Sequence, residues 1–247
     1  MSGRNRLDDI TLPRHGGRVE EVAEARGLDP GSLVDFSSNM NPLAPPAGLS
    51  DYVVEASEEI EIYPDDRYEE FRNSVVDFLA RETDLRLSPR SVIPGNGSVE
   101  IFSLFLRTVA AGGGRRVLVP YPSFSEYGVQ AQLAGLKVDR LSYDEILEMD
   151  GKLRGYAAVF LCNPNNPTGV LRDKEELGKF VARCESRNTR VLVDEAFIEL
   201  ASPDESLVEL LPDSPNLIVV RSLTKEFTIP GLRLGYGVGT GKIAKRI

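Results

Sequence analysis

Short apolar runs alternate along this chain with stretches whose apolar residues recur at helical spacing. Four apolar runs predict strands, at 115–120, 157–162, 190–193 and 216–220. Helical spacing predicts helices over 18–28, 68–82, 99–110, 125–135 and 174–186. Continuous apolar strands that alternate with amphipathic helices favour an α/β fold, a mostly parallel sheet covered by helices on both faces.

The N-terminal part of the chain breaks this rhythm. Residues 1–35 are expected to form an arm with one short helix, which Gly27 ends. Residues 36–49 are rich in Pro, Asn and Ser, so they are expected to be extended or looped. The sequence therefore predicts an arm over 1–35 followed by one large domain over 36–247.

The predicted strands end in polar or aromatic segments: PYPSF, NPNNPTG, DEAF and SLTK. Open α/β sheets bind their ligands outside the carboxyl ends of the strands. Phe124, Asn166, Asp194 and Lys225 are therefore expected to converge on one crevice, although they lie far apart in the sequence.

Composition narrows the class of partner. The chain of 247 residues has 38 acidic and 29 basic residues, a formal net charge of −9, which argues against nucleic acid or an anionic membrane. No apolar run approaches the ~20 residues that span a bilayer, and the N-terminus lacks a signal-peptide core. Two cysteines without CxxC spacing and a single histidine favour reduced thiols and no metal site. A cytoplasmic protein is expected.

The crevice has the groups that an aromatic aldehyde cofactor with a phosphate would need. Lys225 offers an amine that can condense with the aldehyde. Asp194 offers a carboxylate that can keep a ring nitrogen protonated, and Phe124 an aromatic face. Asn166 can donate a hydrogen bond to a ring hydroxyl.

A phosphate site is predicted from two further segments. GNGSVE at 95–100 enters a helix, whose free N–H groups attract anions. Ser222 and Arg233 lie on either side of Lys225 and add a hydroxyl and a guanidinium. GVGTGK at 237–242 is no phosphate loop, because its first glycine is one position out and residue 243 is not Ser or Thr.

At these residues the chain resembles the fold-type-I pyridoxal-phosphate enzymes of the class I/II aminotransferase superfamily. Within it the chain is most similar to the threonine-phosphate decarboxylases and next to the histidinol-phosphate aminotransferases. Six segments carry this resemblance: HGG at 15–17, DFSSNMNPL at 35–43, YPDDRY at 63–68, IPGNGSVE at 93–100, DEAFIE at 194–199 and RSLTKEFTIPGLRLGY at 221–236.

The resemblance implies a role for each matched residue. Lys225 would hold pyridoxal 5'-phosphate covalently, and Asp194 would pair with its ring nitrogen. The implied cofactor-binding set is Gly97, Ser98, Phe124, Asn166, Asp194, Ser222, Thr224, Lys225 and Arg233, with Tyr63 reaching the phosphate from a second subunit. His15 and Asn39 would lie on the substrate side, no metal would take part, and the protein would be a homodimer.

Two departures from the family pattern bear on function. Phe197 stands where many aminotransferases have a tyrosine that donates to the ring hydroxyl, which leaves more of that work to Asn166. The chain ends soon after Arg233, so the smaller C-terminal domain of the family, with its carboxylate-binding arginine, is expected to be missing.

Three functions remain open at this stage. The first is decarboxylation of L-threonine O-3-phosphate to aminopropanol phosphate, in cobalamin biosynthesis. The second is the reaction of a histidinol-phosphate aminotransferase, in histidine biosynthesis, or of another class I/II aminotransferase. The third is a cofactor-binding chain that is inactive or that requires a partner.

Overall fold

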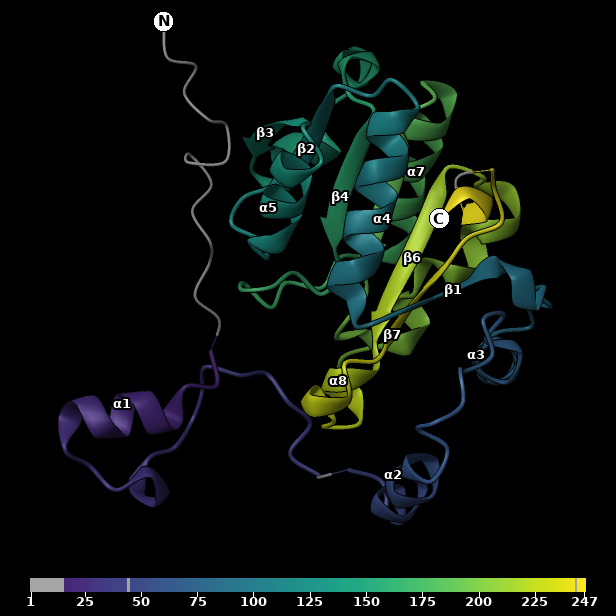
Figure 1. Cartoon of the computed structure of the whole chain (residues 1–247). Coiled ribbons are helices and arrows are strands. Elements are labelled where there is room, and N and C mark those ends of the chain that lie inside the picture. Colours follow the sequence, from purple (N-terminus) through teal and green to yellow (C-terminus); the bar gives the residue numbers. More distant parts are fainter. Residues whose placement is uncertain (1–15, 44, 243) are drawn as a thin grey trace, which may run out of the picture.

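A seven-stranded sheet forms the centre of the computed structural model, which describes residues 16–43, 45–242 and 244–247 (Figure 1). The strands are β1 (Val92–Gly95), β2 (Arg116–Pro120), β3 (Lys137–Leu141), β4 (Ala158–Cys162), β5 (Arg190–Asp194), β6 (Leu217–Ser222) and β7 (Gly235–Val238). Their spatial order is β1-β7-β6-β5-β4-β2-β3. Only β7 runs against its two neighbours, and the pairs among β2 to β6 are parallel. The predicted mostly parallel sheet is confirmed.

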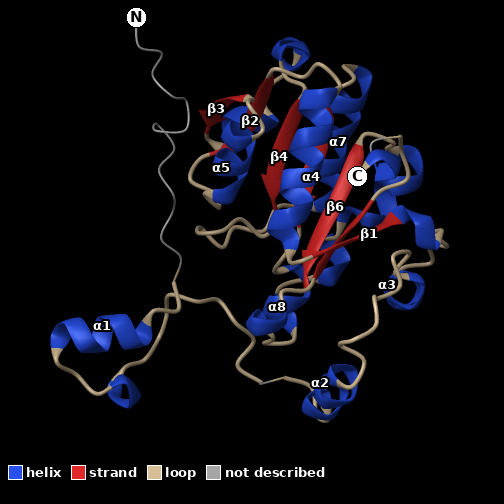
Figure 2. Ribbon diagram, in the orientation of Figure 1, coloured by secondary structure: helices blue, strands red, loops and turns tan. Residues whose placement is uncertain are grey.

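Helices cover the sheet on both faces, as Figure 2 shows. The longer ones are α3 (Glu69–Glu82), α4 (Ser98–Ala111), α5 (Glu126–Leu133) and α7 (Lys174–Ser186), and the short α6 (Tyr143–Leu147) and α8 (Leu223–Glu226) lie in the connections. Alternate strand residues divide between the two layers. Val159 and Leu161 pack with α3 and α7, whereas Ala158 and Phe160 pack with α4 and α5. The period of two in the strands therefore builds two separate cores.

The four predicted strands are present as β2, β4, β5 and β6, but β1, β3 and β7 were not predicted. β3 reads KVDRL and lies at the edge of the sheet, with polar residues at most positions. β7 reads GYGV, and glycine is a poor strand former. A Cβ on Gly235 would lie 2.8 Å from the backbone nitrogen of Ser98, so this strand needs glycine where it meets α4.

The N-terminal segments lie apart from the sheet (Figure 1). They include α1 (Val19–Arg26), which ends at Gly27 with a left-handed φ of 64°, as predicted, and α2 (Leu49–Ser57). Residues 36–43 and 45–48 form neither helix nor strand, in line with their Pro-rich composition. No helix within the described ranges is long and apolar enough to cross a membrane.

Candidate functional site

A cavity of about 550 Å³ opens at the carboxyl ends of β4, β5 and β6. It is lined by nine of the residues predicted from the sequence: Asn39, Ser98, Phe124, Asn166, Asp194, Ser222, Thr224, Lys225 and Arg233. Gly97 borders it through Arg233. Tyr63 does not line it and is 98% exposed. His15 falls outside the residues that the structure describes.

Lys225 reaches the cavity from α8, which directly follows β6. Its Nζ lies 3.8 Å from the sulfur of Met40 and 6.0 Å from the centre of the Phe197 ring. Burial lowers the pKa of Lys225, and the positive charge of Arg233 lowers it further. A larger fraction of this amine is therefore uncharged and nucleophilic near neutral pH than for a surface lysine.

Asp194 is the last residue of β5 and is only 3% exposed. Its carboxylate accepts hydrogen bonds from the Tyr127 hydroxyl, at 2.6 Å, and from the backbone N–H of Ala196, at 3.1 Å. Burial raises the pKa of Asp194 to about 6, although both hydrogen bonds act against the rise. No ion pair joins Asp194 to a cation of the described part of the chain, so this carboxylate is suited to a cationic ligand.

Tyr127 is a site residue that the sequence analysis missed. It is fully buried in α5, its ring stacks on Phe160 at 5.0 Å, and it meets the edge of Phe124 at 5.7 Å. The signal was present, because Tyr127 follows Phe124 by three residues at the start of a helix and so shares its side. Phe124 is half-buried and presents an aromatic wall to the cavity.

Several residues around the cavity carry donors suited to an anion. Gly97 precedes α4 with a φ of 78°, and a Cβ there would lie 2.8 Å from a guanidinium nitrogen of Arg233. The hydroxyls of Ser222 and Thr224 lie 2.7 Å apart. Ser98, the first residue of α4, completes the group. A helix N-terminus, two paired hydroxyls and a guanidinium together form a phosphate-type site.

The remaining wall comes from loops. Asn166 lies in the loop after β4, where its backbone N–H donates to the sulfur of Cys162 at 3.4 Å. Burial raises the pKa of the Cys162 thiol to about 12, so the thiol stays protonated at neutral pH. Asn39 contributes from the exposed segment that precedes Met40.

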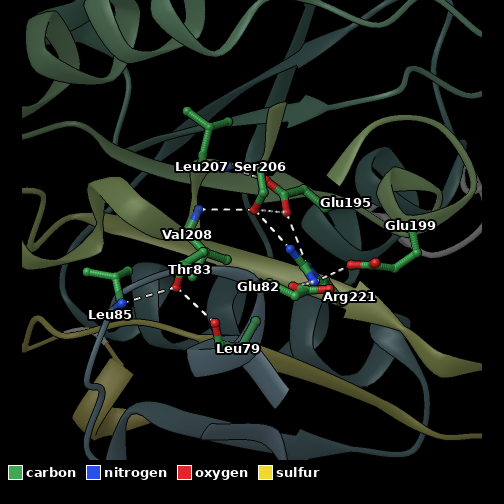
Figure 3. A network of polar contacts seen from close by, with 10 residues as sticks. All are labelled: Leu79, Glu82, Thr83, Leu85, Glu195, Glu199, Ser206, Leu207, Val208 and Arg221. Carbon is green, nitrogen blue, oxygen red and sulfur yellow. Dashed lines mark hydrogen bonds and ion pairs between the residues drawn. The ribbon is translucent and has the colours of Figure 1, made fainter. Parts of the chain in front are cut away.

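A second cluster of charges, also missed by the sequence analysis, lies beside the cavity (Figure 3). Arg221, one residue before Ser222, is 3% exposed and pairs with Glu82 at 2.8 Å, with Glu195 at 3.3 Å and with Glu199. It also donates to the hydroxyl of Ser206 at 3.0 Å. The cluster ties α3, the end of β5 and the following loop to β6.

Comparison with known proteins places these features in one family. The family model "Aminotransferase class I and II" matches residues 32–247. The chain is 37% identical over 240 residues to the threonine-phosphate decarboxylase of Salmonella typhimurium. That match covers 93% of the chain and 63% of the decarboxylase. The chain is also 33% identical over 250 residues to the histidinol-phosphate aminotransferase of Methanothermobacter thermautotrophicus. That match covers 97% of the chain and 63% of the aminotransferase.

A solved structure of one such aminotransferase is similar to this chain in fold and sequence. The histidinol-phosphate aminotransferase from Clostridium acetobutylicum superposes with a TM-score of 0.73 at 30% identity, over 87% of the chain and 63% of that structure. The chain thus spans 63% of the length of each of these relatives.

Proposed function

We propose, from the premise that the chain belongs to the class I and II aminotransferase family, that its cavity binds pyridoxal 5'-phosphate and serves the decarboxylation of L-threonine O-3-phosphate. Enzymes of this family depend on pyridoxal phosphate. One observation carries the proposal: a half-buried amine, a buried carboxylate without a cation partner and a phosphate-type site line one cavity within the described residues.

The residues of the cavity fit the cofactor from end to end. Lys225 would hold the aldehyde carbon, because burial lowers the pKa of its amine and so increases the uncharged, nucleophilic fraction. Asp194 would hold the proton on the ring nitrogen, because that cation would supply the partner that the buried carboxylate lacks. Phe124 would lie against the ring, and Asn166 would donate to the ring hydroxyl.

The phosphate would lie at the N-terminus of α4. Ser98, Ser222, Thr224 and Arg233 would donate to its oxygens, and Gly97 leaves room for the Arg233 guanidinium. Tyr63, exposed and outside the cavity, would reach the phosphate of a second subunit in a homodimer.

When bound, the cofactor supplies an electron sink for the bond that breaks at the substrate Cα. The chain supplies the proton chemistry around it. Asp194, which is only 3% exposed, would hold a proton at the ring nitrogen. Lys225 can return a proton to Cα after carbon dioxide leaves, because burial and the charge of Arg233 lower its pKa and so make its ammonium form a stronger acid.

Amino transfer on a phosphorylated amino compound is the second candidate. The histidinol-phosphate aminotransferases support it, because they stand nearly as close in sequence as the decarboxylases. In that reaction Lys225 would take a proton from Cα instead of giving one. Phe197 is compatible with decarboxylation, and its ring, centred 6.0 Å from the Lys225 nitrogen, has no hydroxyl to donate.

The first experiment measures cofactor binding. The parent protein and Lys225→Ala are incubated with pyridoxal phosphate, gel-filtered and compared by visible absorption. We expect the absorption of lysine-bound cofactor in the parent only. Lys179→Ala is the matched control, because Lys179 is a surface lysine paired with Glu175 at 2.8 Å. Absence of the band from a folded parent would refute the cofactor proposal for this chain.

Substrate assays then separate the functions. We expect carbon dioxide release from L-threonine O-3-phosphate, and amino transfer to 2-oxoglutarate without release would replace decarboxylation by the second candidate. Cofactor binding without either reaction would indicate a chain that is inactive or that requires a partner.

A further inference from the structure

The helix that carries Lys225 is too short to support itself. α8 has four residues, Leu223–Glu226, and an isolated turn of helix is unstable in water. Its four carbonyls also need hydrogen-bond donors, because none can be satisfied within the helix. Two of them accept from the residues that follow, Leu223 from the N–H of Phe227 at 3.1 Å and Thr224 from the N–H of Ile229 at 3.2 Å.

The other two carbonyls are satisfied by Asn41, a residue from the far N-terminal part of the chain. Its backbone N–H donates to the carbonyl of Lys225 at 3.0 Å, and its side-chain amide donates to the carbonyl of Glu226 at 2.8 Å. Its side-chain oxygen accepts from the N–H of Leu43 at 3.0 Å, which fixes the amide. Asn41 thus caps the C-terminus of α8 from 185 residues away.

The same residue also secures the turn after α8. Thr228 has a φ of 52°, a left-handed conformation that β-branched residues rarely adopt. Its hydroxyl donates to the carbonyl of Asn41 at 2.6 Å. All four hydrogen-bonding groups of Asn41 are therefore used, three of them on residues 225–228. Such strain persists only where surrounding contacts hold it, and it is common at functional sites.

We infer that Asn41 is a positioning residue, which caps α8 and thereby holds Lys225 and Met40 in their places in the cavity. The inference rests on the proposed role of Lys225. Met40 directly precedes Asn41, and its sulfur is 3.8 Å from the lysine nitrogen. Ser37, Ser38 and Asn39, from the same segment, line the cavity. One residue therefore joins the wall of the cavity to the turn that carries the amine.

The variants remove the bonds from either side. Asn41→Leu keeps the size of the side chain and removes its bonds to Glu226 and Leu43. Thr228→Val removes only the hydroxyl bond, and Thr228→Ser retains it. Leu43→Ala is the matched control in the same segment, because the Leu43 side chain is 84% exposed.

The readout is the pH dependence of acetylation at Lys225 in the cofactor-free chain, resolved by peptide mass spectrometry with Lys179 as internal reference. A loosened turn would hydrate the amine and return its pKa toward the ordinary value, against the burial and the Arg233 charge that now lower it. We expect several-fold slower acetylation of Lys225 near neutral pH, relative to Lys179, in Asn41→Leu and Thr228→Val, because the pKa of the hydrated amine rises. Thr228→Ser and Leu43→Ala should match the parent.

An unchanged Lys225 profile in both Asn41→Leu and Thr228→Val would overturn the inference. Should Asn41→Leu not fold, the Thr228→Val and Thr228→Ser pair decides alone, and equal profiles in that pair would count against the role. The labelling needs no cofactor. If the parent fails to bind pyridoxal phosphate, the proposed function fails while the acetylation profile still tests whether Asn41 positions the lysine.

Discussion

Two charged clusters share one end of the sheet and differ in how their charges are satisfied. Arg221 and Glu195 belong to a cluster in which one guanidinium meets three carboxylates and a serine hydroxyl (Figure 3). Lys225 follows Arg221 by four residues, and Asp194 directly precedes Glu195. These two charged residues line the cavity instead. Within the described residues, neither has a partner of opposite charge.

The difference separates charges that hold the fold from charges that await a ligand. A buried charge without a partner costs stability, so it is retained where a function requires it. A buried charge with several partners is destabilising to remove. Removing the Arg221 guanidinium should therefore weaken the fold, whereas neutralising the cavity carboxylate should strengthen the cofactor-free fold while removing its function.

Arg221→Met should have the largest effect on stability. It leaves Glu82, Glu195 and Glu199 facing one another without a cation, and breaking such a buried network costs about 3–5 kcal/mol. Urea denaturation should show this loss in the free energy of unfolding.

Arg116→Met is the matched control for that substitution. Arg116 pairs with Asp139 at 2.5 Å on the surface, where its side chain is 43% exposed, so its loss should cost under about 1 kcal/mol. Equal losses in the two variants would show that burial of the Arg221 cluster adds nothing.

Asp194→Asn should raise the stability of the cofactor-free protein above pH 6. The folded pKa of about 6 exceeds the ordinary value of 3.8, so the native state binds the extra proton between these values. The stabilisation by that proton is present at low pH and is lost as the pH rises through about 6. Asparagine does not titrate, so the variant should exceed the parent by up to about 3 kcal/mol near pH 8.

Unfolding of both proteins at several pH values checks this difference, which should vanish near pH 4. The same variant should lose the visible absorption of bound pyridoxal phosphate or bind the cofactor far more weakly. A variant less stable than the parent at pH 8 would mean that Asp194 already has a cationic partner.

The sequence predicted the open cluster, Lys225 and Asp194 in the cavity, better than the closed cluster around Arg221. The reason is physical. Asp194 ends one apolar strand and Lys225 closely follows another, and a charge in such a place is conspicuous against its neighbours. Arg221 stands at an equally informative position after LIVV, but its three partners come from α3 and from loops that no local pattern connects to β6. Contacts between distant segments depend on the folded topology, which local sequence spacing does not specify.

The same limit applies to the rest of the fold and the site. Strands with continuous apolar runs were predicted, whereas β7, with two glycines in four residues, was not. Asn41 was part of a quoted motif, yet its contact with residues 225–228 follows only from the folded chain. Tyr63 stays a prediction, because its proposed place lies on a second subunit.

Tyr127→Phe should have an intermediate effect, confined to the open cluster. It removes the 2.6 Å hydrogen bond to Asp194, and a bond to a charged group contributes about 1.5–3 kcal/mol. Because that bond lowers the pKa of Asp194, its loss should move the titration to a pH above 6. Unfolding measured against pH should show both effects, and Tyr52→Phe, on a phenol that is 71% exposed, should show neither.

Glu199→Gln should have the smallest effect and should tell how the closed cluster balances its charges. Three carboxylates surround one guanidinium, and burial raises the pKa of Glu199 to about 7, with Glu82 adding to the rise. The folded pKa lies above the ordinary 4.5, so the stabilisation by the bound proton is lost as the pH rises through about 7. Glutamine carries no such proton, so the free energy of unfolding of the variant should match that of the parent near pH 5. Near pH 8 it should exceed that of the parent by no more than about 1 kcal/mol, because solvent screens a group at the edge of the cluster. A loss of several kcal/mol at both pH values would instead make Glu199 an ionised partner that Arg221 requires, and the cluster would then be as sensitive to its carboxylates as to its guanidinium.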